Sequence, residues 1–281
     1  MQWILDLLGG PALYKAGCEI WNAFMDVTLA FLLKTPQDVD ASMWSTVVNN
    51  IYPVFLALSV SLVTVFFFAG LYRDVTDFRQ ITGLENMIFI LVRLAGCNAA
   101  VLLLWPFISG AFQSGAALSK LIIDQLGFTP GSGYGHIEAT SIYLSNPQST
   151  LGIGAYLFGS VFMLACLVCG GIVAFSVFSR LWKMIMAVPT GGLAVGTIAG
   201  GGQISAVASS WLKEFLMVIM EASFMVLAIG LAVPFMGVPL IPTSSNTGAL
   251  MSIIEPIFKI VLLTGAITGT SKIVRKYLGL H

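Results

Sequence analysis

Residues 181–212 read LWKMIMAVPTGGLAVGTIAGGGQISAVASSWL, and the path of this stretch decides how the chain folds. Pro189 lacks the N–H that a helix interior requires, and Gly191 follows it almost at once. Three glycines then recur at every fourth residue: Gly192, Gly196 and Gly200. Small residues at this spacing let the backbones of two helices approach closely. The sequence therefore predicts a helix that breaks at Pro189 and then packs tightly against a neighbour.

The composition of the whole chain indicates a membrane protein. Only 26 of the 281 residues are charged (13 Lys and Arg, 13 Asp and Glu), or 9%, whereas a soluble domain carries about 25%. Hydrophobic residues make up 57% of the chain, too large a share for a surface that faces water. The formal net charge is zero, so no overall field attracts a polyanion. These values exclude a soluble enzyme, a disordered chain and a nucleic-acid binder that uses a basic face.

Five apolar runs are long enough to cross about 30 Å of hydrocarbon as helices, which predicts an all-α polytopic protein. They are 51–71, 87–112, 151–178, 215–236 and 253–273. Irregular backbone at membrane depth is tolerated only where protein covers it or water lines it. We therefore expect 185–212, between the third and fourth spans, to be a re-entrant or strongly broken segment.

The basic residues select a topology for this arrangement. If 185–212 dips into the membrane and returns, the basic residues of the loops share one side with the basic C-terminus. These residues are Arg73, Arg79, Arg180, Lys183 and Lys213. The positive-inside rule favours that arrangement over a straight crossing. It predicts five full spans, with the N-terminus outside and the C-terminus in the cytoplasm.

Four regions follow from this topology. Residues 1–50 form an extracytoplasmic N-terminal region, and 51–112 form the first two spans. Residues 113–150 form an extracytoplasmic loop region, and 151–281 form a C-terminal core with a short basic tail. In the first region an apolar stripe recurs at helical spacing: Ile20, Phe24, Val27 and Phe31. Polar residues occupy the opposite face: Glu19, Asn22 and Asp26. This pattern predicts an amphipathic helix that lies in an interface or against other helices.

Ionisable residues inside the spans are costly, so they are the first candidates for function. Glu221 lies about two turns into the fourth span, where it either faces a pore or a neighbouring helix, or is a hydrogen-bonded carboxyl with a structural role. Glu255 and Lys259 stand four residues apart and are expected to pair on one helix face. Arg93, in the second span, is expected to extend its long side chain to the membrane surface.

Other residues are candidates for a polar path or for helix packing. Together with Glu221, the candidate lumen positions are Asn98, Ser205 and Ser209. Gly265 and Gly269 offer a small-residue packing face in the last span. No span carries a continuous polar stripe, so one copy is not expected to enclose a hydrated pore. A ring of identical subunits that share one lumen is the simpler hypothesis.

No pattern in the chain favours catalysis, a cofactor or a metal. His136 and His281 are the only histidines, and His136 with the nearby Glu138 does not make a metal site. Cys166 and Cys169 have a redox spacing, but apolar flanks without a βαβ pattern favour a role in helix packing.

The stretch 179–227 resembles the core of TrbL-type subunits of type IV secretion and conjugation machines. The matching elements, in order, are Arg180, Val188-Pro189, Ala199-Gly200-Gly201, Ser205 or Ser209 to Leu212-Lys213, and Glu221. Gln203 stands where the family often has Glu. The region 43–123 is similar to the Gram-positive branch of the family, through Trp44, Asp77-Phe78-Arg79, Arg93-Leu94 with Asn98, and Leu118-Ser119 with Ile122.

The resemblance implies a non-enzymatic, multi-span subunit of a translocation channel in a bacterial cytoplasmic membrane. It implies secretion ATPases, a coupling protein and other membrane subunits as partners, and a DNA–protein or protein substrate that passes transiently. Two other hypotheses stay open: a small-solute secondary transporter, which a broken helix and Glu221 would suit, and a purely structural membrane scaffold.

Overall fold

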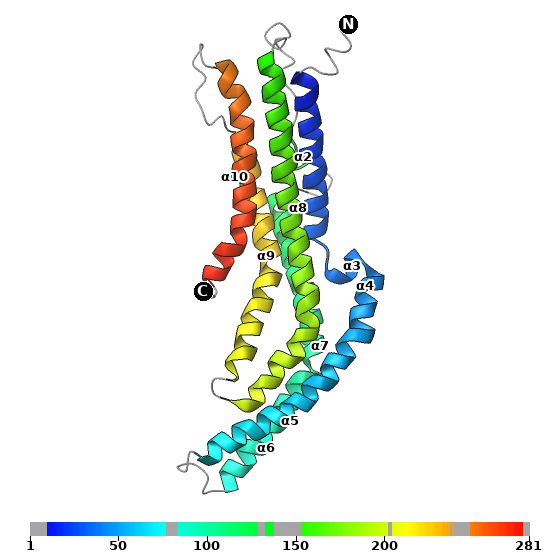
Figure 1. Cartoon of the computed structure of the whole chain (residues 1–281), viewed down its shortest axis with the longest axis vertical. Coiled ribbons are helices and arrows are strands. Elements are labelled where there is room, and N and C mark those ends of the chain that lie inside the picture. The colour runs from blue at the N-terminus through cyan, green and yellow to red at the C-terminus, as the bar shows by residue number, and fades with distance from the viewer. Residues whose placement is uncertain are drawn as a thin grey trace. The chain divides into compact units, whose positions relative to one another are not determined.

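The computed structural model describes residues 10–76, 84–128, 133–137, 153–201, 204–236, 238 and 248–277. Within these ranges the chain is helical and contains no strand, as expected (Figure 1). The helices are α2 (Gly10–Leu32), α3 (Pro36–Val39), α4 (Ala41–Thr46), α5 (Tyr52–Thr76), α6 (Leu84–Leu102), α7 (Leu104–Leu126), α8 (Ile153–Gly196), α9 (Ala206–Met236) and α10 (Gly248–Tyr277). A π-helical turn, η1 (Val47–Ile51), precedes α5, and a 3₁₀ turn, η2 (Thr197–Gly200), follows α8.

Four helical stretches among the described residues are long and apolar enough to cross a membrane. They are Ala41–Tyr72, Tyr156–Gly200, Ala206–Phe235 and Ile254–Lys276. The bent pair Leu91–Leu102 and Leu104–Leu126 makes a fifth if it counts as one span. At 1.5 Å per residue, the 44 residues of α8 extend over about 66 Å, roughly twice the thickness of the hydrocarbon layer. The chain therefore has the helices of a multi-pass membrane protein.

The contacts divide the chain into two compact units, which are described separately. Unit 1 comprises Met1–Leu33, Leu118–Ser179 and Glu221–Val274. Unit 2 comprises Lys34–Ala117, Arg180–Met220 and Arg275–His281. Helices α7, α8, α9 and α10 each contribute residues to both units.

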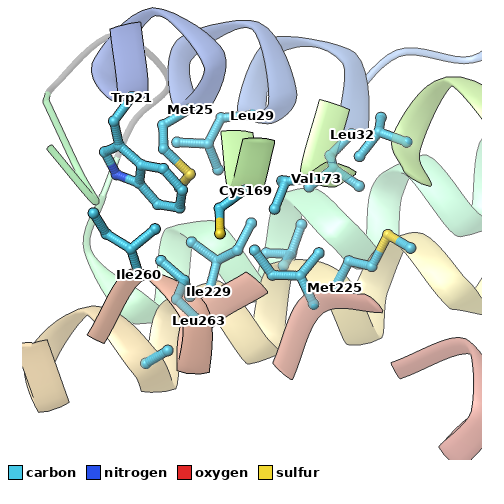
Figure 2. Close-up of a cluster of buried hydrophobic side chains, with 14 of the residues drawn as sticks. Trp21, Met25, Leu29, Leu32, Cys169, Val173, Met225, Ile229, Ile260 and Leu263 are labelled. Atoms are coloured by element: carbon cyan, nitrogen blue, oxygen red, sulfur yellow. The ribbon is translucent and has the colours of Figure 1, made fainter. Parts of the chain in front are cut away.

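The core of unit 1 forms where α2 packs on α8, α9 and α10. Figure 2 shows the α2 side chains Trp21, Met25 and Leu29 facing residues of the other three helices. The buried stripe of α2 is Tyr14, Cys18, Trp21, Met25, Leu29 and Leu32. The predicted apolar stripe is confirmed in part: Phe24 and Phe31 are partly buried and pack on α8, but Val27 is 40% exposed. The centre of the buried face lies one position further on, at Trp21 and Met25.

The polar face of α2 is covered by the segment 133–137, which belongs to the predicted loop region 113–150. Asn22 exchanges two hydrogen bonds with the backbone of Ile137, and Trp21 Nε1 donates to the carbonyl of Gly135 at 3.0 Å. His136 Nε2 lies 2.9 Å from an Asp26 carboxyl oxygen. A short loop thus satisfies polar groups that the sequence assigned to an interface.

The second predicted span is bent, and its second half continues into the predicted loop region. The sequence placed a span over 87–112 and a loop region over 113–150, but α6 ends at Leu102 and α7 runs on to Leu126, with a bend of 49° between them. Pro106 explains the bend, because it has no N–H to donate to the carbonyl of Leu102.

Helix α8 does not break at Pro189, so that part of the prediction is wrong. It continues through Pro189 to Gly196, and the chain reverses only after η2. Proline is tolerated inside membrane helices where neighbouring groups satisfy the backbone around it. Pro189 leaves the carbonyl of Ile185 without its helical donor, and Thr190 Oγ1 donates to the next two carbonyls, those of Met186 and Ala187, at 3.0 and 3.2 Å. The segment 185–212 is therefore a reversal between two helices, which lies between η2 and α9.

Candidate functional site

The most elaborate site in unit 2 is a helical hairpin, residues 180–220, built from the end of α8, η2 and the start of α9 (Figure 1). Its tip begins at Gly201, whose φ is +62°. The carbonyl of Gly201 accepts hydrogen bonds from the N–H groups of Ile204 and Ser205, at 3.2 and 3.4 Å. A positive φ is strained for any residue with a Cβ, so glycine is required at the tip.

The glycine row of the hairpin lies against α5. A Cβ on Gly192 would stand 2.5 Å from Ser59 Oγ, and a Cβ on Gly196 would stand 3.4 Å from the carbonyl oxygen of Ser59. At the end of the row, a Cβ on Gly70 would lie 2.7 Å from the carbonyl oxygen of Gly200. The glycines therefore pack α8 against α5 within one chain.

These contacts also fix the direction of α8 in unit 2. Its residue numbers rise along α5 in the same direction, from Ser59 beside Gly192 to Gly70 beside Gly200. Lys183, two and a half turns before Gly192, therefore lies toward the start of α5, and Arg73 lies at the other end.

These basic residues are therefore not gathered at one end of the hairpin. Lys183 precedes Gly192, and Lys213 follows Trp211, which packs on Gly191, so both lie nearer to Ser59 than to Gly70, whereas Arg73 and Arg93 lie toward the tip. The sequence predicted that 185–212 dips into the membrane and returns; in the structure the α8 arm runs alongside α5 from Ser59 to Gly70. Because basic residues stand at both ends, the positive-inside rule no longer selects an orientation for this unit.

The two arms of the hairpin are joined by a buried arginine and a stacked aromatic pair. Arg180 is 3% exposed, and its Nε donates to the carbonyl of Val218 at 3.1 Å. The rings of Trp211 and Phe215 stack with centroids 5.1 Å apart. A Cβ on Gly191 would lie 2.6 Å from the Trp211 ring, so glycine makes room for the indole between the arms.

Arg93 contacts the tip of the hairpin. Its Nη2 donates to the carbonyl of Ile198 at 3.5 Å, and its guanidinium packs on Gly201. The last carbonyls of a helix lack donors from the helix itself, and a cation there also offsets the helix dipole. The sequence predicted that Arg93 would extend to the membrane surface, but in the structure it caps the end of the first arm.

A groove runs between the two arms and is called the inter-arm groove below. It has a volume of about 230 Å³, and its walls include Lys183, Ala187, Thr190, Trp211, Glu214 and Phe215. A larger hollow of about 660 Å³ shares Thr190, Trp211 and Glu214 with it and continues to Leu62 and Phe66 of α5. Sequence reasoning missed this feature, although the aromatic Trp211 four residues before Phe215 was a usable signal.

The predicted lumen residues of unit 2 do not form a polar path. Asn98 Nδ2 donates to the carbonyl of Leu94 in its own helix at 3.1 Å, and Ser209 Oγ donates to Ala206 at 2.9 Å. Ser205 and Ser209 line a hollow of about 450 Å³ that is otherwise apolar. Its other walls include Leu103, Phe107, Ile198 and Leu212.

Glu221 belongs to unit 1, where it is 1% exposed. Ser271 Oγ of α10 donates to its Oε1, and the Ser119 and Ser223 hydroxyls lie 3.1 Å apart two residues further along α9. The carboxyl thus joins α9 to α10 inside the unit. The structure brings it to Ser271 of the same unit.

The remaining predicted residues have simpler surroundings. Glu255 and Lys259 form the ion pair that their spacing suggested, with 2.6 Å between Lys259 Nζ and Glu255 Oε1. A Cβ on Gly265 or Gly269 would meet no atom within 4 Å. His136 pairs with Asp26, while Glu138, Asp77-Phe78-Arg79 and Gln203 lie outside the described residues. Cys18, Cys97, Cys166 and Cys169 are free thiols and are buried.

No known protein family, curated protein or solved structure matches this chain.

Proposed function

We propose that the chain is a TrbL-type subunit of the translocation channel of a type IV secretion or conjugation machine in a bacterial cytoplasmic membrane. The observation that carries the proposal is the role of the resembling residues in the hairpin. Arg180 binds one arm to the other, and Gly200 and Gly201 form the close-packed tip. Residues that carry the resemblance are thus residues that build a defined structural element, which supports a shared fold over a chance similarity.

In this proposal several copies of the chain surround a common lumen. Many large apolar side chains face outward from the single chain, among them Val54, Phe68 and Tyr72 on α5 and Phe175 on α8. Such surfaces suit lipid or a neighbouring subunit and do not suit a charged polymer, since each charge in contact with hydrocarbon costs at least a few kcal/mol. The partners are other copies, further membrane subunits, secretion ATPases, a coupling protein and, transiently, the DNA–protein substrate.

The test is made in donor cells that lack the gene. Expression of the wild-type chain is expected to restore transfer of the conjugative element, and the tagged chain is expected to co-purify with secretion ATPases. Gly192→Leu, which forces α8 away from Ser59, is expected to lower transfer while the protein still inserts. Gly171→Leu on the same helix, where a Cβ meets nothing within 4 Å, is the matched control. Normal transfer in cells without the gene contradicts the proposal.

A second candidate, a small-solute secondary transporter, rests on Glu221. A carboxyl that is 1% exposed within an apolar helix is a common feature of coupling sites in transporters. The other support for this candidate, a helix broken at Pro189, is lost because α8 continues to Gly196. Saturable solute uptake into liposomes, abolished by Glu221→Gln, would favour the transporter; absence of uptake leaves the channel subunit or a structural scaffold.

A further inference from the structure

We propose that the inter-arm groove binds one anionic phospholipid, with the phosphate beside Lys183 and an acyl chain along the apolar walls. The inference rests on the groove alone and does not depend on the proposed function.

The walls of the groove suit hydrocarbon. Between its polar residues lie Met186, Ala187, Phe215 and Val218. The hydroxyl of Thr190 already donates to backbone carbonyls of its own helix, at 3.0 and 3.2 Å. A polar solute would find few hydrogen-bond donors there. An acyl chain needs none, so its burial in the groove leaves no polar group without a hydrogen-bond partner.

The groove has the shape of a slot with one charged end. Its hollow of about 230 Å³ is smaller than a typical small-molecule site of roughly 300–1,000 Å³, so it holds part of a ligand. The neighbouring hollow shares Trp211 with it and extends the slot to Leu62 and Phe66. A long flexible chain fits this outline, with the rest of the molecule outside the slot.

The charged end attracts an anion. Lys183 is exposed and is the basic residue among the groove walls. Glu214 is the one acidic residue among these walls, and its Oε1 lies 3.5 Å from Arg275 Nη2. Since Arg275 offsets Glu214, the charge of Lys183 leaves the groove net positive, and basic residues at a membrane surface attract anionic headgroups.

Aromatic packing closes the groove behind Phe215. Phe215 contacts Phe112, with ring centroids 5.6 Å apart, and Phe112 contacts Trp44 at 6.0 Å. All three side chains are buried, so this wall of the groove is apolar and packed. Such a wall suits an acyl chain rather than a polar ligand.

The test is a lipid titration of the purified full-length chain, followed by native mass spectrometry. Wild-type protein is expected to bind phosphatidylglycerol more tightly than phosphatidylcholine. Lys183→Gln is expected to lower the affinity for phosphatidylglycerol about fivefold and to leave phosphatidylcholine binding unchanged, because only the headgroup attraction is lost. Lys120→Gln, an exposed lysine of unit 1, is the matched control and is expected to keep the wild-type preference.

A photoreactive acyl chain on phosphatidylglycerol locates the site. Crosslinks are expected on residues of the inter-arm groove and are expected to disappear in Ala187→Phe, which fills the slot. Ala57→Phe, at an exposed position of α5, is expected to keep them. The proposal is overturned by equal affinity for the two lipids, by an unchanged preference in Lys183→Gln, or by crosslinks in the groove that persist in Ala187→Phe.

Discussion

At the scale of single residues, the hairpin depends on positions where a side chain has no room or a polar group has a defined partner. Gly201 carries the positive φ of the tip, and Arg93 lies directly on it. Arg180 bridges the arms through the Val218 carbonyl. In unit 1 the corresponding contact is between Glu221 and Ser271. These contacts are short-range, so single substitutions report on them.

Gly201→Ala is expected to destabilise the protein by at least about 1–2 kcal/mol, because a Cβ disfavours positive φ and would also collide with the Arg93 guanidinium. Thermal unfolding in detergent measures the loss. Gly96→Ala on α6, where a Cβ meets nothing within 4 Å, is expected to be neutral or to stabilise by up to about 1 kcal/mol. Equal effects of the two substitutions would show that the tip is not constrained as described.

Ser271→Ala is expected to cost about 1–3 kcal/mol, since it leaves a buried carboxyl oxygen of Glu221 without its donor. Thr268 lies on the same helix, where its hydroxyl donates to the carbonyl of Thr264, and Thr268→Ala is expected to have a smaller effect. A double-mutant cycle with Glu221→Gln measures the coupling between the two side chains. Additive effects in that cycle would mean that the hydrogen bond does not stabilise the fold.

Cys18 is expected to resist thiol reagents in the folded protein. Burial raises the pKa of its thiol to about 11, with the neighbouring Glu19 acting in the same direction. The thiolate is the reactive form, so reactivity should stay low at pH 8 and should appear only as the pH approaches 11 or when the protein unfolds. Maleimide labelling read by peptide mass spectrometry tests this, with Cys18→Ser as the blank. Rapid labelling of Cys18 at pH 8 in folded protein would contradict the buried position of α2.

At the scale of elements, α8 shows how one helix serves two environments. Its first part packs against α2, where a Cβ on Gly170 would lie 2.5 Å from the Phe24 ring, and its last part packs against α5. Pro106 of α7 and Pro189 of α8 affect their helices differently. Pro106 accompanies a bend of 49°, while α8 continues through Pro189.

Gly192→Leu is expected to separate α8 from α5 and to lower the stability by several kcal/mol, because even its Cβ would stand 2.5 Å from Ser59 Oγ. Ser59→Gly in the same chain should restore part of the loss by making room on α5. A cysteine pair placed across the two helices reports their separation through crosslinking yield. The idea fails if Gly192→Leu behaves like Gly171→Leu, whose added side chain enters open space.

At the scale of the whole molecule, the structure of unit 2 bears on the membrane topology of the hairpin. Its hairpin arms run beside α5, with Lys183 and Lys213 at the base and the tip near Gly70. If α5 crosses the bilayer, the arms cross it as well. The distribution of basic residues predicted that Lys183 and Lys213 share one side with Arg73, whereas the parallel course of α8 and α5 separates Lys183 from Arg73 along the helix axis.

Cysteines introduced at Lys183 and Lys213 are therefore expected to label from one face of the membrane, and a cysteine at Arg73 from the other. Impermeant maleimide added to intact cells and to inverted vesicles separates the two faces. The native thiols are buried, so their background should be low. Labelling of all three positions from the same face would restore the re-entrant arrangement.

Much of the site could be located from the sequence, but its partners could not. The glycine spacing predicted a close packing surface, and the four-residue spacing predicted the pair of Glu255 and Lys259. Neither spacing identifies the helix against which the residues pack. Asn98 and Ser209 show the consequence, since in the single chain both donate hydrogen bonds within their own helices, to Leu94 and Ala206.

The sequence by itself determined the class of protein, because 9% charged residues and long apolar runs leave no stable fold in water. It also determined that helices would carry these runs, since backbone groups in hydrocarbon must be satisfied within the segment. Only the tertiary structure decided which stripe of α2 is buried, whether Pro189 ends a helix, and which end of α5 meets the hairpin tip. Those choices depend on contacts between residues far apart in the chain, such as Gly200 with Gly70, and local periodicity carries no information about them.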